Sequence, residues 1–339
     1  MRILILNVGS SSVKYEVFDK ERSIVKGKIE RIRDKKGFSS ALKKIAGILR
    51  ANKIYFDAVG HRVVHGGAIK SASRVSRSLI KRIEKVNDLA PLHNIPEVRA
   101  IKLCLKLFRK PQFAVFDTAF HQTMPEKAFT YALPYGLADR FGIRKYGFHG
   151  TSHEYVAHEA CRKLRKDIRR SRIITCHLGN GCSITAIKNR KSIDTSMGFT
   201  PLEGLVMGTR CGDIDPAITI FLQKKGYSAN QIDKMLNHKS GLLGISGLSN
   251  DIRDLLKSKS RRARLAIDIF VYRIIKYIGA YHAVLGGADI LVFTGGIGEN
   301  SPQIINGIIR EIRHLRIKRA VVVKTDEARM MARKISGLL

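Results

Sequence analysis

The segment Asn7-Val8-Gly9-Ser10-Ser11-Ser12-Val13-Lys14 follows directly on the apolar run Ile3-Leu4-Ile5-Leu6 and decides the fold of this chain. A second segment, Leu178-Gly179-Asn180-Gly181-Cys182-Ser183, follows the apolar residues 173–176 in the same way. Each segment leads into another β-rich run, at residues 15–18 and 184–187. The sequence therefore predicts strand, tight turn and strand at both places.

The composition of both turns is suited to holding phosphate. Glycine admits positive φ and lets the backbone approach a ligand, and exposed N–H groups with serine hydroxyls form a nest for anionic oxygens. Two nests indicate a duplicated domain that clamps one polyphosphate from two sides. Simple hairpins remain the alternative, because neither turn fits the P-loop or the G-x-G-x-x-G pattern.

Length and composition indicate a globular protein of two domains. The chain has 339 residues, of which 44% are hydrophobic, enough for substantial cores. Asn7 interrupts the first apolar run, so it does not read as a signal peptide, and no run approaches the length of a membrane span. Five cysteines without a Cys-x-x-Cys pair indicate free thiols in a reducing cytoplasm.

The formal net charge of +34 raises the possibility of a nucleic-acid partner. The basic residues gather at 162–170, 257–264 and 310–319, where apolar residues recur between the charges as on the wet face of a helix. No zinc finger, basic zipper or aromatic RNA platform accompanies them. Nucleic acid is therefore not expected as the main partner, and the charge would attract anionic substrates.

Strand and helix patterns occur twice in the same order. Strands are predicted at residues 2–6, 15–18, 23–29, 58–64 and 113–116, with a helix at 39–51. Further strands are predicted at 173–176, 184–187 and 290–294, with helices at 217–225, 229–237 and 263–285. This order fits an α/β duplication better than one doubly wound sheet, with a boundary near Phe120.

Four polar segments leave strand ends or glycine-rich loops, where α/β proteins place their sites. They are Gly60-His61-Arg62-Val63-Val64-His65-Gly66-Gly67, Phe116-Asp117-Thr118-Ala119-Phe120-His121, Tyr146-Gly147-Phe148-His149-Gly150-Thr151-Ser152-His153 and Thr209-Arg210-Cys211-Gly212-Asp213-Ile214-Asp215-Pro216. Taken singly, each could be a surface ion pair, a cap or a turn residue. Together with two phosphate-type turns they indicate a catalytic site.

With these residues in view, the chain resembles the acetokinase family of the actin-like and sugar-kinase superfamily over almost its full length. Eight segments in order carry the resemblance: Asn7 to Lys14, Gly60 to Gly67, Ala90 to Asn94, Phe116 to Pro125, Tyr146 to His153, His177 to Gly181, Thr200 to Gly212 and Phe293 to Asn300. Related butyrate kinases lack the Asp-Thr-Ala-Phe-His and His-Gly-Thr-Ser-His segments and fit less well.

The resemblance implies an α/β fold of two duplicated actin-like, ribonuclease H-like domains with a catalytic cleft between them. Residues 1–119, together with the tail 328–339, would form the acyl and metal side, and residues 120–327 the nucleotide-binding domain. The implied reaction is reversible transfer of the ATP γ-phosphoryl group to acetate, which gives acetyl phosphate and ADP. Closure of the cleft would be part of the mechanism.

The resemblance also implies roles for individual residues. Asp117, His149 and Arg210 match catalytic positions, and Arg62, Val64, Leu92, Phe148 and Pro201 match substrate-binding positions. Asn7 and Glu327 match positions associated with Mg²⁺ or Mn²⁺. The nucleotide positions are Lys14, His177, Leu178, Gly179, Asn180, Gly181, Asp251, Ile252, Arg253, Gly296, Ile297, Gly298, Glu299 and Asn300. A homodimer in the cytoplasm, with no membrane partner, is implied as well.

Asp117 is expected to orient an arginine or a metal-bound water rather than to move a proton, because a carboxylate nucleophile has no proton to lose. Acetate is the expected substrate, and propionate is expected to be a poorer one.

The chain is shorter than is usual for the family between Asn300 and Thr325, so pyrophosphate remains an alternative phosphoryl donor to ATP. A sugar kinase of the same superfamily and a non-catalytic binding protein remain the alternatives from other classes.

Overall fold

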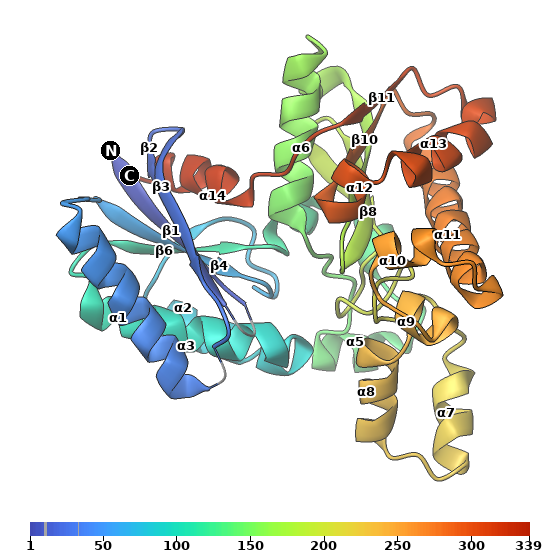
Figure 1. Ribbon diagram of the computed structural model, residues 1–339. Coiled ribbons are helices and arrows are strands. Elements are labelled where there is room, and N and C mark those ends of the chain that lie inside the picture. The colour runs from blue at the N-terminus through green and yellow to red at the C-terminus, as the bar shows by residue number, and fades with distance from the viewer. Residues whose placement is uncertain (10–11, 33) are drawn as a thin grey trace. The chain divides into compact units, whose positions relative to one another are not determined.

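The computed structural model describes residues 1–9, 12–32 and 34–339, and gives the backbone but not the side chains of Lys35, Lys36, Pro91 and Leu92 (Figure 1). Ser10 and Ser11 of the first predicted phosphate turn lie outside the described residues. The chain forms two compact units. Unit 1 comprises residues 1–122, 148–155 and 326–339, and unit 2 comprises residues 123–147 and 156–325.

Unit 1 is built on a six-stranded sheet of order β3-β2-β1-β4-β6-β5. Strands β1 and β2 are antiparallel, as are β2 and β3, whereas β1, β4 and β6 run parallel. The elements of this unit are β1 (Arg2–Val8), β2 (Val13–Asp19), β3 (Arg22–Ile29), α1 (Lys35–Ala51), β4 (Ala58–Val63), β5 (Ser73–Arg74), α2 (Arg77–Glu84), η1 (Asn87–Leu89), α3 (Pro91–Leu107), β6 (Gln112–Phe116), η2 (Ala119–Thr123, which runs into unit 2) and α14 (Glu327–Ser336).

Alternation along β1 buries both faces of this sheet. Leu4, Leu6 and Val8 join a core with α1 and α3, whereas Ile3 and Ile5 join a separate core with α14. Because successive side chains of a strand point to opposite faces, one apolar run serves two cores. The central strand is thereby fixed: its register with β4 extends to Leu6, and Asn7 follows, opposite Lys14 of β2.

Unit 2 repeats the arrangement in a five-stranded sheet of order β11-β10-β7-β8-β9. Its strands are β7 (Arg172–Leu178), β8 (Cys182–Lys188), β9 (Lys191–Thr195), β10 (Ile290–Thr294) and β11 (Arg319–Val322). Its helical elements are α4 (Glu126–Phe129), α5 (Tyr135–Phe141), η3 (Ile168–Arg170), α7 (Ala217–Lys224), α8 (Ala229–His238), α9 (Gly241–Ser246), α10 (Ile252–Lys257), α11 (Arg261–Leu285), α12 (Gly295–Asn300), α13 (Pro302–Glu311) and η4 (Arg313–Leu315). Helix α6 (Gly150–Lys163) begins in unit 1 and continues in unit 2.

The two sheets share one topology, which confirms the predicted duplication. In each sheet an antiparallel three-strand meander is followed by two parallel strands: β3-β2-β1-β4-β6 in unit 1 corresponds to β9-β8-β7-β10-β11 in unit 2. The two glycine–serine segments occupy equivalent places, since each joins the first two strands. In both turns a glycine N–H closes the loop, Gly9 onto the Ser12 carbonyl at 2.8 Å and Gly179 onto the Gly181 carbonyl at 3.1 Å.

The division differs from the predicted domain boundaries in three places. The first segment of unit 1 ends at residue 122 rather than at 119. Residues 148–155 belong to unit 1, because the Gly150 N–H donates to the Asp117 carbonyl at 2.9 Å. Glu327 belongs to unit 1 as well, since it opens α14, the helix that packs on β1 and β4. The segment thought to be shortened, residues 300–325, retains α13 and β11, and β11 completes the second sheet.

The three basic runs are less helical than predicted. Residues 162–170 hold the end of α6 and the short η3, residues 257–264 hold the junction of α10 and α11, and residues 310–319 run through η4 into β11. The charges therefore gather at helix ends rather than along helix faces. The cations at the ends of α6, α10 and α13 lie at the favourable negative pole of the helix dipole, whereas Arg261, Arg262 and Arg264 lie in the first turn of α11, at its positive pole. Among the described residues, no helix combines the length and the apolar character that crossing a membrane requires.

Candidate functional site

The polar residues of unit 1 follow the carboxyl ends of its parallel strands. Asn7 lies near the end of β1, Arg62 near the end of β4, and Asp117 directly after β6. Arg62 is in register with Val115, and the Asp117 N–H donates to the Val63 carbonyl at 3.0 Å. Parallel strands bring their carboxyl ends to one edge of the sheet, so the fold gathers these side chains there.

Arg62 is held by two carboxylates. Its Nε donates to Asp117 Oδ1 at 3.1 Å and its Nη2 to Asp117 Oδ2 at 2.6 Å. Glu327 Oε2 lies 3.7 Å from the Arg62 Nε. The Asp117 side chain is 1% exposed and that of Arg62 is 19% exposed. A bidentate pair of this kind fixes both the position and the plane of the guanidinium group.

Burial and charge act against each other in this cluster. Burial raises the pKa of Asp117, while the charge and hydrogen bonds of Arg62 act to lower it. Burial likewise opposes the charge of Arg62, but the carboxylates of Asp117 and Glu327 raise its pKa overall. Arginine stays protonated in proteins. The cluster therefore keeps a permanent cation at the edge of the sheet.

The backbone of the glycine–histidine segment packs directly against Asp117. His149 adopts a left-handed conformation, with φ of +55°, which is uncommon outside glycine and marks functional or strained positions. A side chain at Gly150 would overlap the Asp117 carbonyl oxygen. The His121 Nε2 lies 2.9 Å from the Phe148 carbonyl oxygen. Unit 1 thus brings Arg62, Asp117, Phe148 and His149 together at one site.

Two residues of α3 that were assigned no role from the sequence hold the loop after β4, although Asn94 ends one of the segments that carry the resemblance. The Val64 N–H donates to Glu97 Oε2 at 2.9 Å. The His65 N–H donates to Asn94 Oδ1 at 3.0 Å, and Asn94 Nδ2 donates back to the His65 carbonyl at 2.9 Å. Asn94 and Glu97 are both buried. They stand three residues apart on one helix face, and this spacing together with the segment Ala90 to Asn94 is the signal that the sequence offers.

Glu97 makes the stability of the fold depend on pH. Burial raises the pKa of its carboxyl from 4.5 to about 8, against the lowering effect of the Val64 N–H and of Arg62. Between these values the folded chain holds a proton that the unfolded chain releases, so stability falls as pH rises through this window. We expect Glu97→Gln to unfold with a shallower pH dependence, and to gain a few kcal/mol over the unmodified protein by about pH 8.5.

Chemical denaturation at pH 5, 7 and 8.5 measures this effect. Glu84→Gln is the matched control, because Glu84 lies on the surface and pairs with Lys102. Parallel pH curves for Glu97→Gln and the unmodified protein would rule out the buried proton.

Unit 2 contains a cavity of about 380 Å³ beside its glycine turn. Residues from the β7–β8 turn, the start of α10, helix α12 and the start of α13 line it: Gly179, Asn180, Asn250, Asp251, Ile252, Arg253, Gly296, Ile297, Asn300 and Ser301. All but Asn250 and Ser301 are among the predicted nucleotide positions. The volume lies within the range of small-molecule sites.

The remaining predicted nucleotide positions lie outside the cavity lining. Glu299 accepts hydrogen bonds from the N–H groups of Gly295 at 3.0 Å and Thr325 at 3.1 Å, so its carboxylate fastens the start of α12. Leu178 and Gly298 are buried in the unit. His177 lies in β7 opposite Ser183, and Gly181 closes the turn. Lys14 belongs to β2 of unit 1 and is exposed there.

Arg210 lies in unit 2, in the long loop of residues 196–216 between β9 and α7. Its Nη1 donates to the carbonyl of Pro201 at 3.3 Å. Burial lowers the pKa of Arg210. Among the described residues no carboxylate lies within ion-pair distance of it. Arg62 and Arg210 thus differ, since Arg62 is paired with two carboxylates and Arg210 has no acidic partner among the described residues.

The predicted metal positions, Asn7 and Glu327, have donors that suit magnesium. They supply an amide and a carboxylate oxygen in unit 1, and Asp117, which was predicted as a catalytic position, adds a second carboxylate there. Mg²⁺ prefers oxygen donors from one or two carboxylates, completed by water and phosphate. Within the described ranges no group of three or more histidine, cysteine, aspartate or glutamate side chains could hold a metal by itself. The residues therefore fit a magnesium ion that is bound together with a phosphate ligand.

The duplicated sheets and the polar groups at their strand ends define a two-unit α/β kinase of the actin-like class. The chain belongs to the acetokinase family, whose profile matches residues 33–335. An acetate kinase from Halothermothrix orenii is 49% identical over 94% of this chain and 89% of its own length. The family and the kind of enzyme predicted from the sequence are confirmed.

Solved structures agree with this assignment. The crystal structure of an acetate kinase from Porphyromonas gingivalis aligns with a TM-score of 0.91 and 38% identity over 100% of both chains. That of a propionate kinase from Francisella tularensis aligns with a TM-score of 0.93 and 39% identity over 98% of both chains. Both alignments extend over the two units, so the similarity is not confined to one of them.

Proposed function

We propose that this protein is an acetate kinase that transfers the γ-phosphoryl group of ATP reversibly to acetate. The observation that carries the proposal is the engagement of both Asp117 carboxylate oxygens by Arg62. A kinase that phosphorylates a hydroxyl group needs a base for its proton, and Asp117, so engaged, is poorly placed to act as one. A carboxylate acceptor needs no base, but it needs a cation, which Arg62 supplies.

In the proposed reaction a carboxylate oxygen of acetate attacks the γ-phosphorus in line, and the bond to the β-phosphate oxygen breaks. The electron pair leaves with ADP, and no proton is transferred. Such transfers depend on positioning and on neutralising charge over the phosphoryl oxygens. Arg62 would bind the acetate carboxylate, while Arg210 and His149 would stabilise the transferring group. Asp117 would hold Arg62 in its plane.

Magnesium, or manganese in its place, would neutralise charge on the nucleotide phosphates. We propose Asn7, Asp117 and Glu327 as the residues that hold it, because Asp117 and Glu327 are the carboxylates paired with Arg62 and Asn7 stands near the end of β1, the strand that pairs with β4. The nucleotide would occupy the cavity of unit 2. Asn180 from the glycine turn and the start of α12 would meet its phosphates, because helix N-termini and backbone nests favour anions.

The substrate pocket is proposed to favour acetate over propionate. Val64, Leu92, Phe148 and Pro201 are the residues proposed to surround the methyl group, and the Leu92 side chain lies outside the described part of the chain. One methylene changes binding in an apolar pocket by about 1–3 kcal/mol, so kcat/KM for propionate should be about 10- to 200-fold lower. Initial rates at limiting substrate measure the ratio. Equal kcat/KM values would count against a methyl-sized pocket.

A hydroxylamine trap tests the proposed function. Acyl phosphates react with hydroxylamine to give coloured hydroxamates, whereas sugar phosphates do not. The reaction is run with acetate, propionate or butyrate as acceptor, and with ATP or pyrophosphate as donor. We expect hydroxamate from acetate with ATP and a magnesium salt. Product with pyrophosphate alone would assign a different donor, and no product with any acid would refute the function.

Exposed apolar side chains and free cysteines bear on assembly and location. A homodimer is proposed, and exposed apolar side chains on α7, among them Ile220 and Phe221, offer a surface for it. Light scattering would show a mass of two chains.

A cytoplasmic location is proposed because the five cysteines are all unpaired. Nucleic acid is not proposed as a partner. Salt-sensitive DNA binding without kinase activity would instead indicate a non-catalytic protein that binds nucleic acid.

A further inference from the structure

The loop that carries Arg210 has little regular structure of its own. Residues 196–216 contain no helix or strand, and loops longer than about 12–15 residues without secondary structure are uncommon in compact domains and usually functional. Arginine side chains act in catalysis only when their position is fixed in advance. Contacts from outside the loop must therefore hold it. Hydrogen bonds join Thr209 and Cys211 to the end of α8 and the residues after it, and two acidic side chains in the loop provide further contacts.

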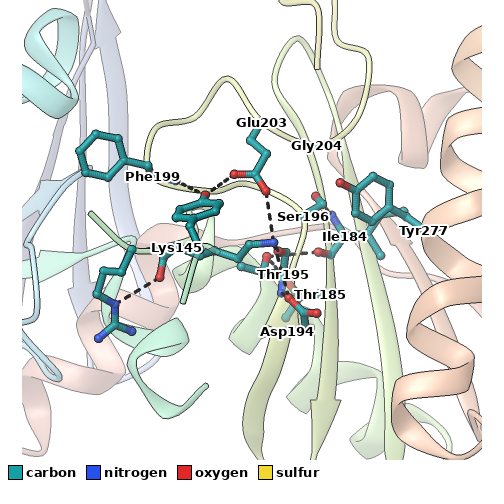
Figure 2. A network of polar contacts seen from close by, with 12 residues as sticks. Lys145, Ile184, Thr185, Asp194, Thr195, Ser196, Phe199, Glu203, Gly204 and Tyr277 are labelled. Carbon is teal, nitrogen blue, oxygen red and sulfur yellow. Dashed lines mark hydrogen bonds and ion pairs between the residues drawn. The ribbon is translucent and has the colours of Figure 1, made fainter. Parts of the chain in front are cut away.

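The first of these acids is Glu203, which lies between a tyrosine and a lysine. The Tyr131 hydroxyl donates to Glu203 Oε2, and the Lys145 ammonium lies 3.3 Å from Glu203 Oε1. Figure 2 shows the Glu203 carboxylate directed toward the Lys145 side chain. Lys145 also donates to the Thr195 carbonyl at 3.1 Å, at the end of β9. Glu203 thus ties the loop to the strand that precedes it.

Tyr131 holds a second point of the same loop. Its hydroxyl accepts the Phe199 N–H at 2.9 Å while it donates to Glu203. Burial, and after it the neighbouring Glu203 charge, raises the pKa of Tyr131, so the hydroxyl keeps its proton and donates. A side chain at Gly198 would overlap both the Glu203 carboxylate and the Tyr131 hydroxyl. The Glu203 carboxylate and the Tyr131 hydroxyl therefore fill the space beside Gly198.

The second acid, Asp213, closes the loop on itself. The Gly204 N–H donates to Asp213 Oδ1 at 2.8 Å, and the Asp213 N–H donates to the Gly204 carbonyl at 2.9 Å. The Tyr277 hydroxyl of α11 donates to Asp213 Oδ2 at 2.7 Å. The two hydrogen bonds between Gly204 and Asp213 close residues 204–213 into a smaller loop, which contains Arg210. Glu203 directly precedes this smaller loop.

We propose that Glu203, Tyr131 and Lys145 are positioning residues for the phosphoryl transfer, which act by holding Arg210 in its loop. The role of Arg210 rests on the proposed function, but the holding of the loop does not. None of the three side chains needs to touch a substrate. Loss of one hydrogen bond at this anchor would leave the fold intact and let the guanidinium group move.

Tryptic cleavage after Arg210 reports the order of the loop without any assay of activity. Arg210 is the only lysine or arginine between Lys191 and Lys224, so cleavage in the loop can occur at one place. Mass spectrometry follows the fragment ending at Arg210, normalised to cleavage after Lys225. We expect Tyr131→Phe, Glu203→Gln and Lys145→Met each to accelerate this cleavage about tenfold. Lys145→Arg keeps the ion pair and should restore slow cleavage.

Measurements of kcat and KM then test whether the anchor of the loop affects catalysis through Arg210. Tyr131→Phe should lower kcat by about 10- to 100-fold with the KM for ATP unchanged, because a displaced catalytic group weakens the transition state. Tyr135→Phe is the matched control, since this exposed tyrosine of α5 loses the same hydroxyl group. In an Arg210→Ala background, Tyr131→Phe should lower kcat no further.

The outcomes separate this inference from the proposed function. Unchanged cleavage after Arg210 in Tyr131→Phe and Glu203→Gln would overturn the inference, as would additive losses in the Arg210→Ala background. If the unmodified protein makes no acyl phosphate, the proposed function fails, and the cleavage rates still decide whether the three residues hold the loop.

Discussion

Arg210→Ala should lose about 10³-fold or more in kcat, because an arginine that meets transferring phosphoryl oxygens contributes 10³–10⁵ in related reactions. Arg210 makes one hydrogen bond of 3.3 Å to the Pro201 carbonyl and a longer contact of 3.8 Å to the Met207 sulfur. No carboxylate of the described residues pairs with it. Its charge is therefore available to the reactants rather than consumed in the fold.

Because Arg210 has no acidic partner among the described residues, we also expect Arg210→Ala to fold normally. Removing an arginine that has no acidic partner leaves no buried carboxylate uncompensated, unlike the loss of Arg62. The KM for ATP should change little, because the interaction belongs to the transition state. Arg310→Ala is the control, since it removes the same charge from an exposed site of α13 in unit 2. A loss of less than tenfold in kcat would show that Arg210 is not at the reacting group.

Asp117→Asn should lower kcat by about 10²-fold without a shift of the pH profile, because a misplaced guanidinium group weakens its hold on the acyl group. The amide would turn one acceptor oxygen into a donor and set it against the Arg62 guanidinium. The apparent affinity for magnesium should fall as well, since Asp117 is one of the oxygen donors proposed for the ion. Initial rates across pH and magnesium concentration measure the three quantities together.

Asp19→Asn is the matched control for this variant. Asp19 pairs with Arg2 at 3.3 Å in the same unit, but the pair is exposed, and exposed ion pairs contribute little to stability. An Asp117→Asn enzyme with an unchanged magnesium response and a shifted pH profile would contradict the positioning role. That result would assign a proton transfer to Asp117.

The hairpins at the two glycine turns could be predicted because local signals decide them. An apolar run, a glycine turn and a second apolar run fix strand, turn and strand without reference to the rest of the chain. Asn7, Arg62 and Asp117 could be singled out for the same reason, since each stands near the end of a recognisable strand. The parallel order of β1, β4 and β6, which brings these residues to one edge of the sheet, came from the structure.

The residues that hold these groups could not be predicted, because their roles depend on contacts across long separations. Glu97 meets Val64 from a helix that contains Pro96 and that no local pattern marked. Glu203 meets Tyr131 across 72 residues. Strand β11 was missed because its side chains are mostly exposed and it begins with Arg319. In each case tertiary contacts outweigh propensity, which is a weak prior by itself.

The most direct measurement of the central claim follows the oxygen atoms of acetate. Phosphorus NMR of the protein with ATP, a magnesium salt and ¹⁸O-labelled acetate reports which oxygen links carbon to phosphorus in the product. If the carboxylate oxygen attacks the γ-phosphorus, the acetyl phosphate signal carries the isotope shift of one ¹⁸O bonded to phosphorus. An unshifted acetyl phosphate signal, or none at all, would contradict direct transfer to acetate.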